Sequence, residues 1–170
     1  MKQIAKHLAL SVTPVAQSEL FGEQPATMLS LLTSNAPLGL ALSFRQYIAD
    51  QVQKLATPSA QGAIANLLAL TSLAIPNLIE EFRNARNPEI RSTIVFAISQ
   101  FKDESVVDFF IQAMDDIYEQ TWMNALDGLV NIGGPSVIRR LTVFMVSLNP
   151  DDIRGAWTME AIDQITQTLS

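Results

Sequence analysis

The chain of 170 residues has no cysteine and only one histidine, His7. Without thiols it has neither a disulfide framework nor thiolate chemistry, and this composition suits a reducing compartment. A metal site requires clustered histidine, cysteine or carboxylate ligands, which a lone histidine does not provide. No serine lies in a Gly-x-Ser-x-Gly elbow, and the glycines of 128–134 lack the lysine of a phosphate-binding loop. We therefore expect a protein that is not an enzyme and has no cofactor or metal.

Basic residues are also scarce. The chain has 11 Lys and Arg against 17 Asp and Glu, which gives a formal net charge of −6. A nucleic-acid partner requires a basic stripe that displaces counterions from phosphates, so we expect no such partner. Hydrophobic residues make up 48% of the sequence, which excludes disorder and predicts one domain with a sizeable core.

Uninterrupted apolar runs of membrane-spanning length are missing as well. The charge-free stretches 24–44 and 55–79 are broken by prolines and polar residues, whereas a span needs about 20 mainly apolar residues. The apolar run at 8–12 is shorter than the core of a signal peptide, which has about 7–15 apolar residues. We expect a cytoplasmic protein with no membrane partner.

The sequence does contain a series of helix signals, punctuated by proline and glycine. Apolar residues recur at helical spacing, and no alternating pattern typical of strands competes with it. Residues 149–152 form a helix cap before the last predicted helix, which begins at 153. We expect helices over residues 15–21, 24–32, 37–56, 60–73, 75–86, 89–101, 105–115, 118–132, 137–148 and 153–169.

A five-residue pattern recurs four times, at 69–73, 97–101, 128–132 and 161–165. Each copy has a small residue, an apolar one, two mostly polar ones and a large apolar one, and the copies are 28, 31 and 33 residues apart. This period is typical of stacked helical repeats. The small residue lets neighbouring helices approach, and a single helix pair cannot bury its apolar face alone, so adjacent pairs must stack.

In two of the units an Asn-Pro turn precedes an Ile-Arg pair and, further on, the small residue. The residues are Pro76, Asn87, Pro88, Ile90, Arg91 and Ala97 in one unit, and Asn149, Pro150, Ile153, Arg154 and Ala161 in the last. These units resemble HEAT repeats, in particular the short bacterial type of the phycobilisome-lyase-like group. The middle unit departs from this pattern, because its turn at 115–116 is Asp-Asp and Gly128 stands where the other two units have alanine. The resemblance implies an all-α, right-handed α-solenoid of antiparallel helix pairs. We expect one domain over 1–170, in which 1–56 forms an irregular helical N-terminal cap and 57–170 forms HEAT-like repeats.

HEAT proteins mostly supply protein-binding surfaces, so the resemblance implies a non-enzymatic binder of another protein. Charge favours a basic partner, because the stretch 103–138 holds seven acids and no Lys or Arg. Such a surface steers a basic protein toward it, although a merely solvated acidic face has the same composition. The acid pairs 115–116 and 151–152 precede helices, where they complement the helix dipole.

Superposing the second helices of the repeats aligns amides, carboxylates and two aromatics along one flank, where HEAT proteins usually have their concave face. Aromatic residues are good anchors at interfaces. Alternatively, Phe96 and Trp157 only pack between layers. The candidate partner-binding residues, which include acids of 103–138, are Thr93, Phe96, Gln100, Asp115, Asp116, Glu119, Asn124, Asp127, Asn131, Trp157, Glu160 and Gln164.

One concrete hypothesis, from size and charge, is an immunity protein that neutralises a basic toxin domain. An alternative is a bilin lyase or other pigment-handling protein, for which His7, Tyr118 and Trp122 are the candidate contacts. HEAT-like DNA glycosylases share the architecture, but the acidic stretch opposes a cationic groove. A third hypothesis is a structural oligomer subunit. Only three acids and four bases precede Glu80, so the front half is a candidate homodimer surface.

Overall fold

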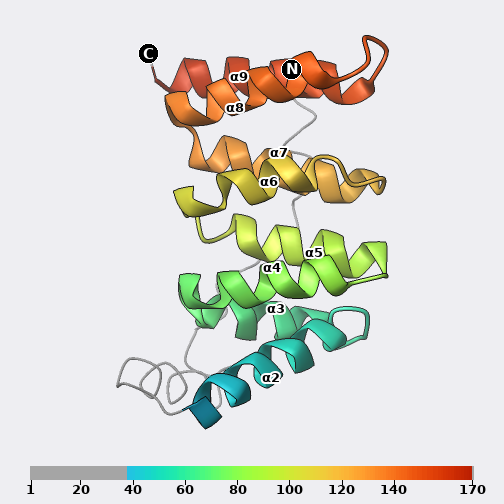
Figure 1. Cartoon of the computed structure of the whole chain (residues 1–170), viewed down its shortest axis with the longest axis vertical. Coiled ribbons are helices and arrows are strands. Elements are labelled where there is room, and N and C mark those ends of the chain that lie inside the picture. Colours follow the sequence, from blue (N-terminus) through green and yellow to red (C-terminus); the bar gives the residue numbers. More distant parts are fainter. Residues whose placement is uncertain (1–37, 170) are drawn as a thin grey trace.

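The computed structural model describes residues 38–169, and over that range the chain folds into helices without strands. Figure 1 shows them stacked in chain order along the long axis of the molecule. The helices predicted over 15–21 and 24–32 lie outside the described residues. The elements are α2 (Leu38–Lys54), α3 (Ala60–Ala69), η2 (Thr71–Ala74), α4 (Ile75–Asn84), α5 (Pro88–Ser99), η3 (Glu104–Val106), α6 (Val107–Ala113), α7 (Glu119–Ile132), α8 (Gly134–Ser147) and α9 (Ile153–Thr168).

Short polar side chains cap α5 and α9, and the cap before α9 is the one that the sequence predicts. The Asn87 side chain accepts a hydrogen bond from the backbone N–H of Glu89 at 2.9 Å, directly before α5. The Asp152 side chain does the same for the backbone N–H of Arg154 at the start of α9, also at 2.9 Å. Such bonds satisfy backbone donors that have no partner within the helix. Between α7 and α8, Gly133 has a φ of 68°, which glycine adopts at little cost.

The helices pack as consecutive pairs, α2 with α3, α4 with α5, α6 with α7 and α8 with α9. The second helices α5 and α7 pack most extensively, and α9 continues along α7. One buried apolar core runs from Phe44 to Ile165. Because α2 also packs against α4, the 38–54 segment is part of the same stack. This packing favours a repeat region that begins before 57, while the predicted division into 1–56 and 57–170 stays a prediction.

The small residue of the recurring pattern lies where neighbouring helices meet. Ala97 is 0% exposed and Ala161 is 3% exposed. A Cβ added at Gly128 would lie only 2.7 Å from the Phe110 ring and 3.1 Å from Cβ of Ser99. There is no room for a larger side chain at this crossing, and the predicted reason for the small residue is confirmed at this position.

The first copy of the pattern is not equivalent to the others. The helix predicted over 60–73 ends at Ala69, and Thr71, with a φ of 58°, begins a short 3-10 turn. The chain then bends by 112° into α4, so that Leu70 and Ala74 stay buried while Leu73 is 46% exposed. In α2, Leu42 is 64% exposed, whereas Ile48 is fully buried.

Over residues 38–169, no single helix is both long and apolar enough to cross a membrane. The segments Ala60–Ala69 and Thr71–Asn84 reach that length and apolarity only when taken together across the 112° bend between them. Both segments contribute to the buried core, with Leu67 and Leu78 at 0% exposure.

Candidate partner-binding face

Each second helix carries one row of side chains at equivalent positions. Residues spaced by four, seven and eleven lie on one face of an α-helix. All members of this row except the α7 residue at position 124 are exposed or half-buried. The second-helix flank, as we call it, consists of Glu89, Thr93, Phe96 and Gln100 on α5, Gln120, Asp127 and Asn131 on α7, and Ile153, Trp157, Glu160 and Gln164 on α9.

On α5 the polar members of the flank bond to their own helix. The Thr93 hydroxyl donates to the carbonyl of Glu89 at 2.8 Å. The Gln100 amide donates to the Ser99 hydroxyl at 3.1 Å while its residue stays exposed. Phe96 is half-buried, as Trp157 is on α9, so each ring both packs against the helices and presents an edge to solvent. The two rings are thus partly packed, and their role as partner contacts stays a prediction.

Asn124 is the predicted contact residue that does not lie on the surface. It is 5% exposed, and its side-chain amide donates 3.0 Å hydrogen bonds to the carbonyl and the hydroxyl of Ser92 on α5. Its side-chain carbonyl accepts from the Gln120 amide at 3.0 Å. Buried amides need such partners, and these bonds fasten α7 to α5. Asn124 is thus a structural residue, and Gln120 takes its place on the exposed flank.

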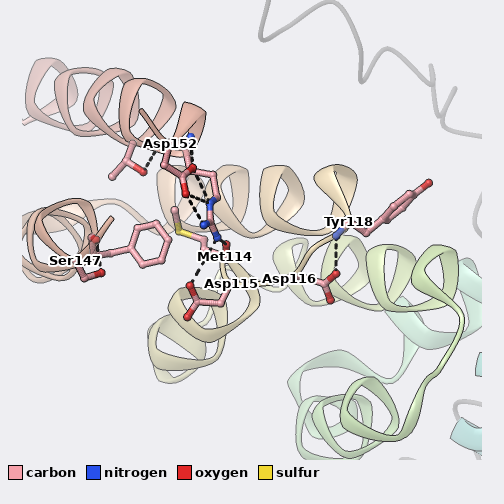
Figure 2. A network of polar contacts seen from close by, with 9 residues as sticks. Met114, Asp115, Asp116, Tyr118, Ser147 and Asp152 are labelled. Carbon is pink, nitrogen blue, oxygen red and sulfur yellow. Dashed lines mark hydrogen bonds and ion pairs between the residues drawn. The ribbon is translucent and has the colours of Figure 1, made fainter. Parts of the chain in front are cut away.

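Asp116 is also committed to the structure. Its side chain is 8% exposed and forms a two-pronged ion pair with Arg91, at 2.6 Å from Nε and 3.0 Å from a terminal nitrogen. It further accepts a hydrogen bond from the Tyr118 backbone N–H at 2.9 Å (Figure 2). Burial opposes ionisation of Asp116, but the Arg91 bond, the Tyr118 bond and the Arg91 charge outweigh it and lower its pKa. This carboxylate ties the middle turn to α5 and is not available to a partner.

Arg154 joins the same turn to the last repeat. Its guanidinium donates hydrogen bonds of 2.9 Å to the Asp152 carboxylate and to the Met114 carbonyl. The Asp115 carboxylate lies 3.7 Å away and stays 71% exposed. Hydrogen bonds from the Arg154 side chain and backbone lower the pKa of Asp152 to about 2. Of the predicted acid pair, Asp115 alone keeps a free edge toward solvent, next to a positive charge.

The acidic stretch 103–138 is therefore not an open acidic face. Arginines from outside it reach three of its seven acids, since Arg140 also pairs with Asp108 at 2.8 Å. Asp103 accepts a hydrogen bond from the Ser105 backbone N–H at 2.9 Å, which makes it a cap. Four acids of the stretch have no ion-pair partner among the described residues, namely this cap residue and Glu104, Glu119 and Asp127.

Where α7 and α9 run side by side, a shallow hollow of about 20 Å³ lies between their side chains. It brings together three predicted partner contacts, Asp127, Trp157 and Gln164, with the candidate pigment contact Trp122. The remaining lining residues were not singled out from the sequence as contacts. Trp122 is only 5% exposed and forms part of its wall. The lining residues are Trp122, Met123, Leu126, Asp127, Trp157, Ala161 and Gln164.

Asp127 is the one ionisable side chain in this hollow. It is half-buried and has no hydrogen bond or ion pair to any described residue. Burial among apolar neighbours raises the pKa of Asp127 to about 6. A carboxylate in such a position is poorly solvated and gains from a cation supplied by another molecule.

The second helices carry acids that are not balanced by free cations on the same helices. Helices α5, α7 and α9 carry two cations in total, Arg91 and Arg154, and both are held by aspartates at the turns. The flank itself carries Glu89, Asp127 and Glu160, one carboxylate on each helix and no cation. The flank therefore presents uncompensated negative charge.

A second hollow, of about 330 Å³, lies between the starts of α6 and α8. Its charges are of both signs, since Glu104 and Asp108 face Arg139 and Arg140, and they largely cancel. Within residues 38–169, no three His, Cys, Asp or Glu side chains gather as metal ligands would. His7 lies outside the described residues.

Several members of the flank and the hollow were not predicted from the sequence. Glu89 and Ile153 continue the aligned rows by one turn toward the start of each helix, so extending the pattern would have found them. Met123 and Leu126 read as ordinary apolar residues of α7, and only the packing of α9 shows that they line a hollow.

A comparison with family models supports this architecture. The model of HEAT repeats matches residues 75–162, from the start of α4 into α9, which is more than half of the chain. A comparison with curated proteins found no match. The helices stack as consecutive pairs and the HEAT-repeat model spans most of that stack, so the chain belongs to the HEAT-repeat family.

Proposed function

We propose that the chain is a non-enzymatic scaffold that binds a basic protein on its second-helix flank. HEAT repeats commonly serve as protein-interaction scaffolds. The observation that carries the proposal is the charge of the flank: Glu89, Asp127 and Glu160 form no ion pair with any described residue, whereas both arginines of these helices are already bound.

Physical arguments explain how such a flank would work. A surface of one sign raises the rate at which an oppositely charged protein arrives, and salt weakens this attraction. Half-buried aromatic side chains at the centre of an interface then supply much of the affinity. In this proposal Phe96 on α5 and Trp157 on α9 are the aromatic anchors, while Gln100, Asn131 and Gln164 provide adaptable hydrogen bonds.

The proposed geometry is a right-handed solenoid of antiparallel pairs. Connections of a few residues join α4 to α5 and α8 to α9, and short connections are typical of antiparallel neighbours. In this arrangement the second helices line one side of the stack, so their flanks merge into one surface that the first helices do not cover.

A narrower form of the proposal is an immunity protein that neutralises a basic toxin domain, supported by small size and net charge of −6. A pigment-handling role gains less support. Ligand pockets for such molecules have volumes of about 300–1,000 Å³, whereas the hollow beside Trp122 has about 20 Å³. The phycobilisome-lyase-like subtype stays a resemblance. A homodimer through the charge-poor front half stays a proposal, to which the exposed Leu42 is relevant.

The test uses two double variants with the same change in charge. Glu89→Lys with Glu160→Lys reverses the flank, while Glu104→Lys with Asp163→Lys reverses exposed acids elsewhere. Each chain is used as bait in extracts of its own cells, captured proteins are quantified by mass spectrometry, and the leading protein is purified and titrated by calorimetry. We expect a basic protein that binds wild type and the second variant with affinities within about threefold of each other, and the flank variant about 100-fold more weakly.

Equal binding by all three chains, or an acidic partner, would contradict the proposal. Circular dichroism spectra of each variant establish that a loss of binding is not a loss of fold. Repeating the titration at two salt concentrations separates electrostatic attraction from apolar contact, because exposed charges are screened over about 8–10 Å at 0.1–0.15 M salt.

A further inference from the structure

The hollow between α7 and α9 combines an acid with aromatic walls. Both tryptophans of the whole sequence, Trp122 and Trp157, line it, and so does the unpaired carboxylate of Asp127. No cation lies among the lining residues, in contrast to the carboxylate of Asp116, which Arg91 neutralises. The hollow thus has the groups that hold a cation and lacks the cation itself.

We propose that this hollow receives the ammonium group of a lysine side chain from the partner protein. This inference rests on the proposed function and adds the chemistry that the flank recognises. The ammonium would form an ion pair with Asp127 and lie against the indole of Trp157, while its aliphatic stem would cover Met123. Tryptophan is the aromatic side chain that attracts a cation most strongly.

Size and surroundings favour lysine over arginine. The hollow has a volume of about 20 Å³, which suits a group about as large as one water molecule. An ammonium is a compact point charge, whereas a guanidinium is a broad plane that requires a wider slot or two acceptors side by side. The burial that raises the pKa of Asp127 also makes an incoming cation more valuable, because it would supply the missing counter-charge.

The native tryptophans provide the assay. Because both line the hollow, their indole N–H signals in nitrogen-15 NMR spectra report on this place alone. The probe is an acetylated and amidated octalysine peptide, titrated at constant ionic strength. Octaarginine and an octalysine with every side chain acetylated serve as comparison peptides. The variants are Asp127→Asn, which keeps the shape of the side chain, and Asp163→Asn as a matched loss of one exposed charge on α9.

We expect octalysine to shift both indole signals saturably, with an affinity that falls about tenfold or more in Asp127→Asn and changes less than about twofold in Asp163→Asn. Acetylated octalysine should leave the signals unchanged. Tighter binding of octaarginine, an equal effect of the two variants, or unmoved indole signals would overturn the inference. If the flank variant still loses its partner protein in that case, the proposed function stands without the lysine site.

Discussion

Replacing Asp127 by Asn should make the unliganded protein more stable. In the folded chain the Asp127 carboxylate is half-buried without a partner among the described residues, and its pKa is raised from 3.8 to about 6. A shift of about two units corresponds to about 3 kcal/mol, at about 1.4 kcal/mol per unit. Because part of the group is exposed and screened by solvent, we discount this to about 1–2 kcal/mol. For a chain of this length, that is a rise in Tm of about 3–6 °C.

The effect should depend on pH in a specific direction. Since the pKa of Asp127 is higher in the folded state, its ionisation destabilises the fold at pH values above about 6. As the pH falls from about 6 to below 3.8, the group becomes protonated in both states and the penalty disappears. Asp127→Asn should thus gain stability over wild type at pH 7.5 and have little advantage at pH 4.

Urea unfolding followed by circular dichroism measures this difference. Wild type, Asp127→Asn and the exposed control Asp163→Asn are compared at pH 7.5 and pH 4.0, each as a free energy of unfolding. Only Asp127→Asn should be more stable than wild type, and only at the higher pH. An advantage of equal size at both pH values, or none at pH 7.5, would refute the reasoning that this carboxylate is held without a counter-charge.

Three further substitutions test the packing and the turns. Gly128→Ala places a methyl group against the Phe110 ring and should lower the free energy of unfolding in urea by about 1–2 kcal/mol. Adding Phe110→Leu to this variant should restore part of the loss. Arg91→Ala leaves Asp116 buried without its cation and should cost about 3 kcal/mol, less when Asp116→Asn is added. Ala97→Glu puts a charge into a fully buried position, and a thermal melt like that of wild type would contradict the packing of α5.

The stack of helix pairs could be predicted from the sequence because its signals are local. Asn87 and Asp152 cap helices by bonding to a backbone N–H two residues on, so the sequence alone places them. The small residues at 97, 128 and 161 mark the helix crossings through their regular spacing. The bend at Leu70 has no such signal, because the burial of Leu70 and Ala74 against the rest of the stack decides it.

The contact surface was harder to predict because long-range partners decide which polar residues are free. Asp116 and Asn124 read as surface residues, yet Arg91 and Ser92, 25 and 32 residues away, bind them in the structure. Asp127 has the same local character and no partner among the described residues. The charge count over 103–138 could not separate these cases, because the arginines that neutralise the stretch come from other repeats.

Calorimetric titration of the purified partner with the two charge-reversed chains tests the binding surface most directly. We predict that Glu89→Lys with Glu160→Lys binds about 100-fold more weakly than wild type, while Glu104→Lys with Asp163→Lys binds as wild type does. Equal affinities of the two variants would mean that the second-helix flank is not the surface that binds.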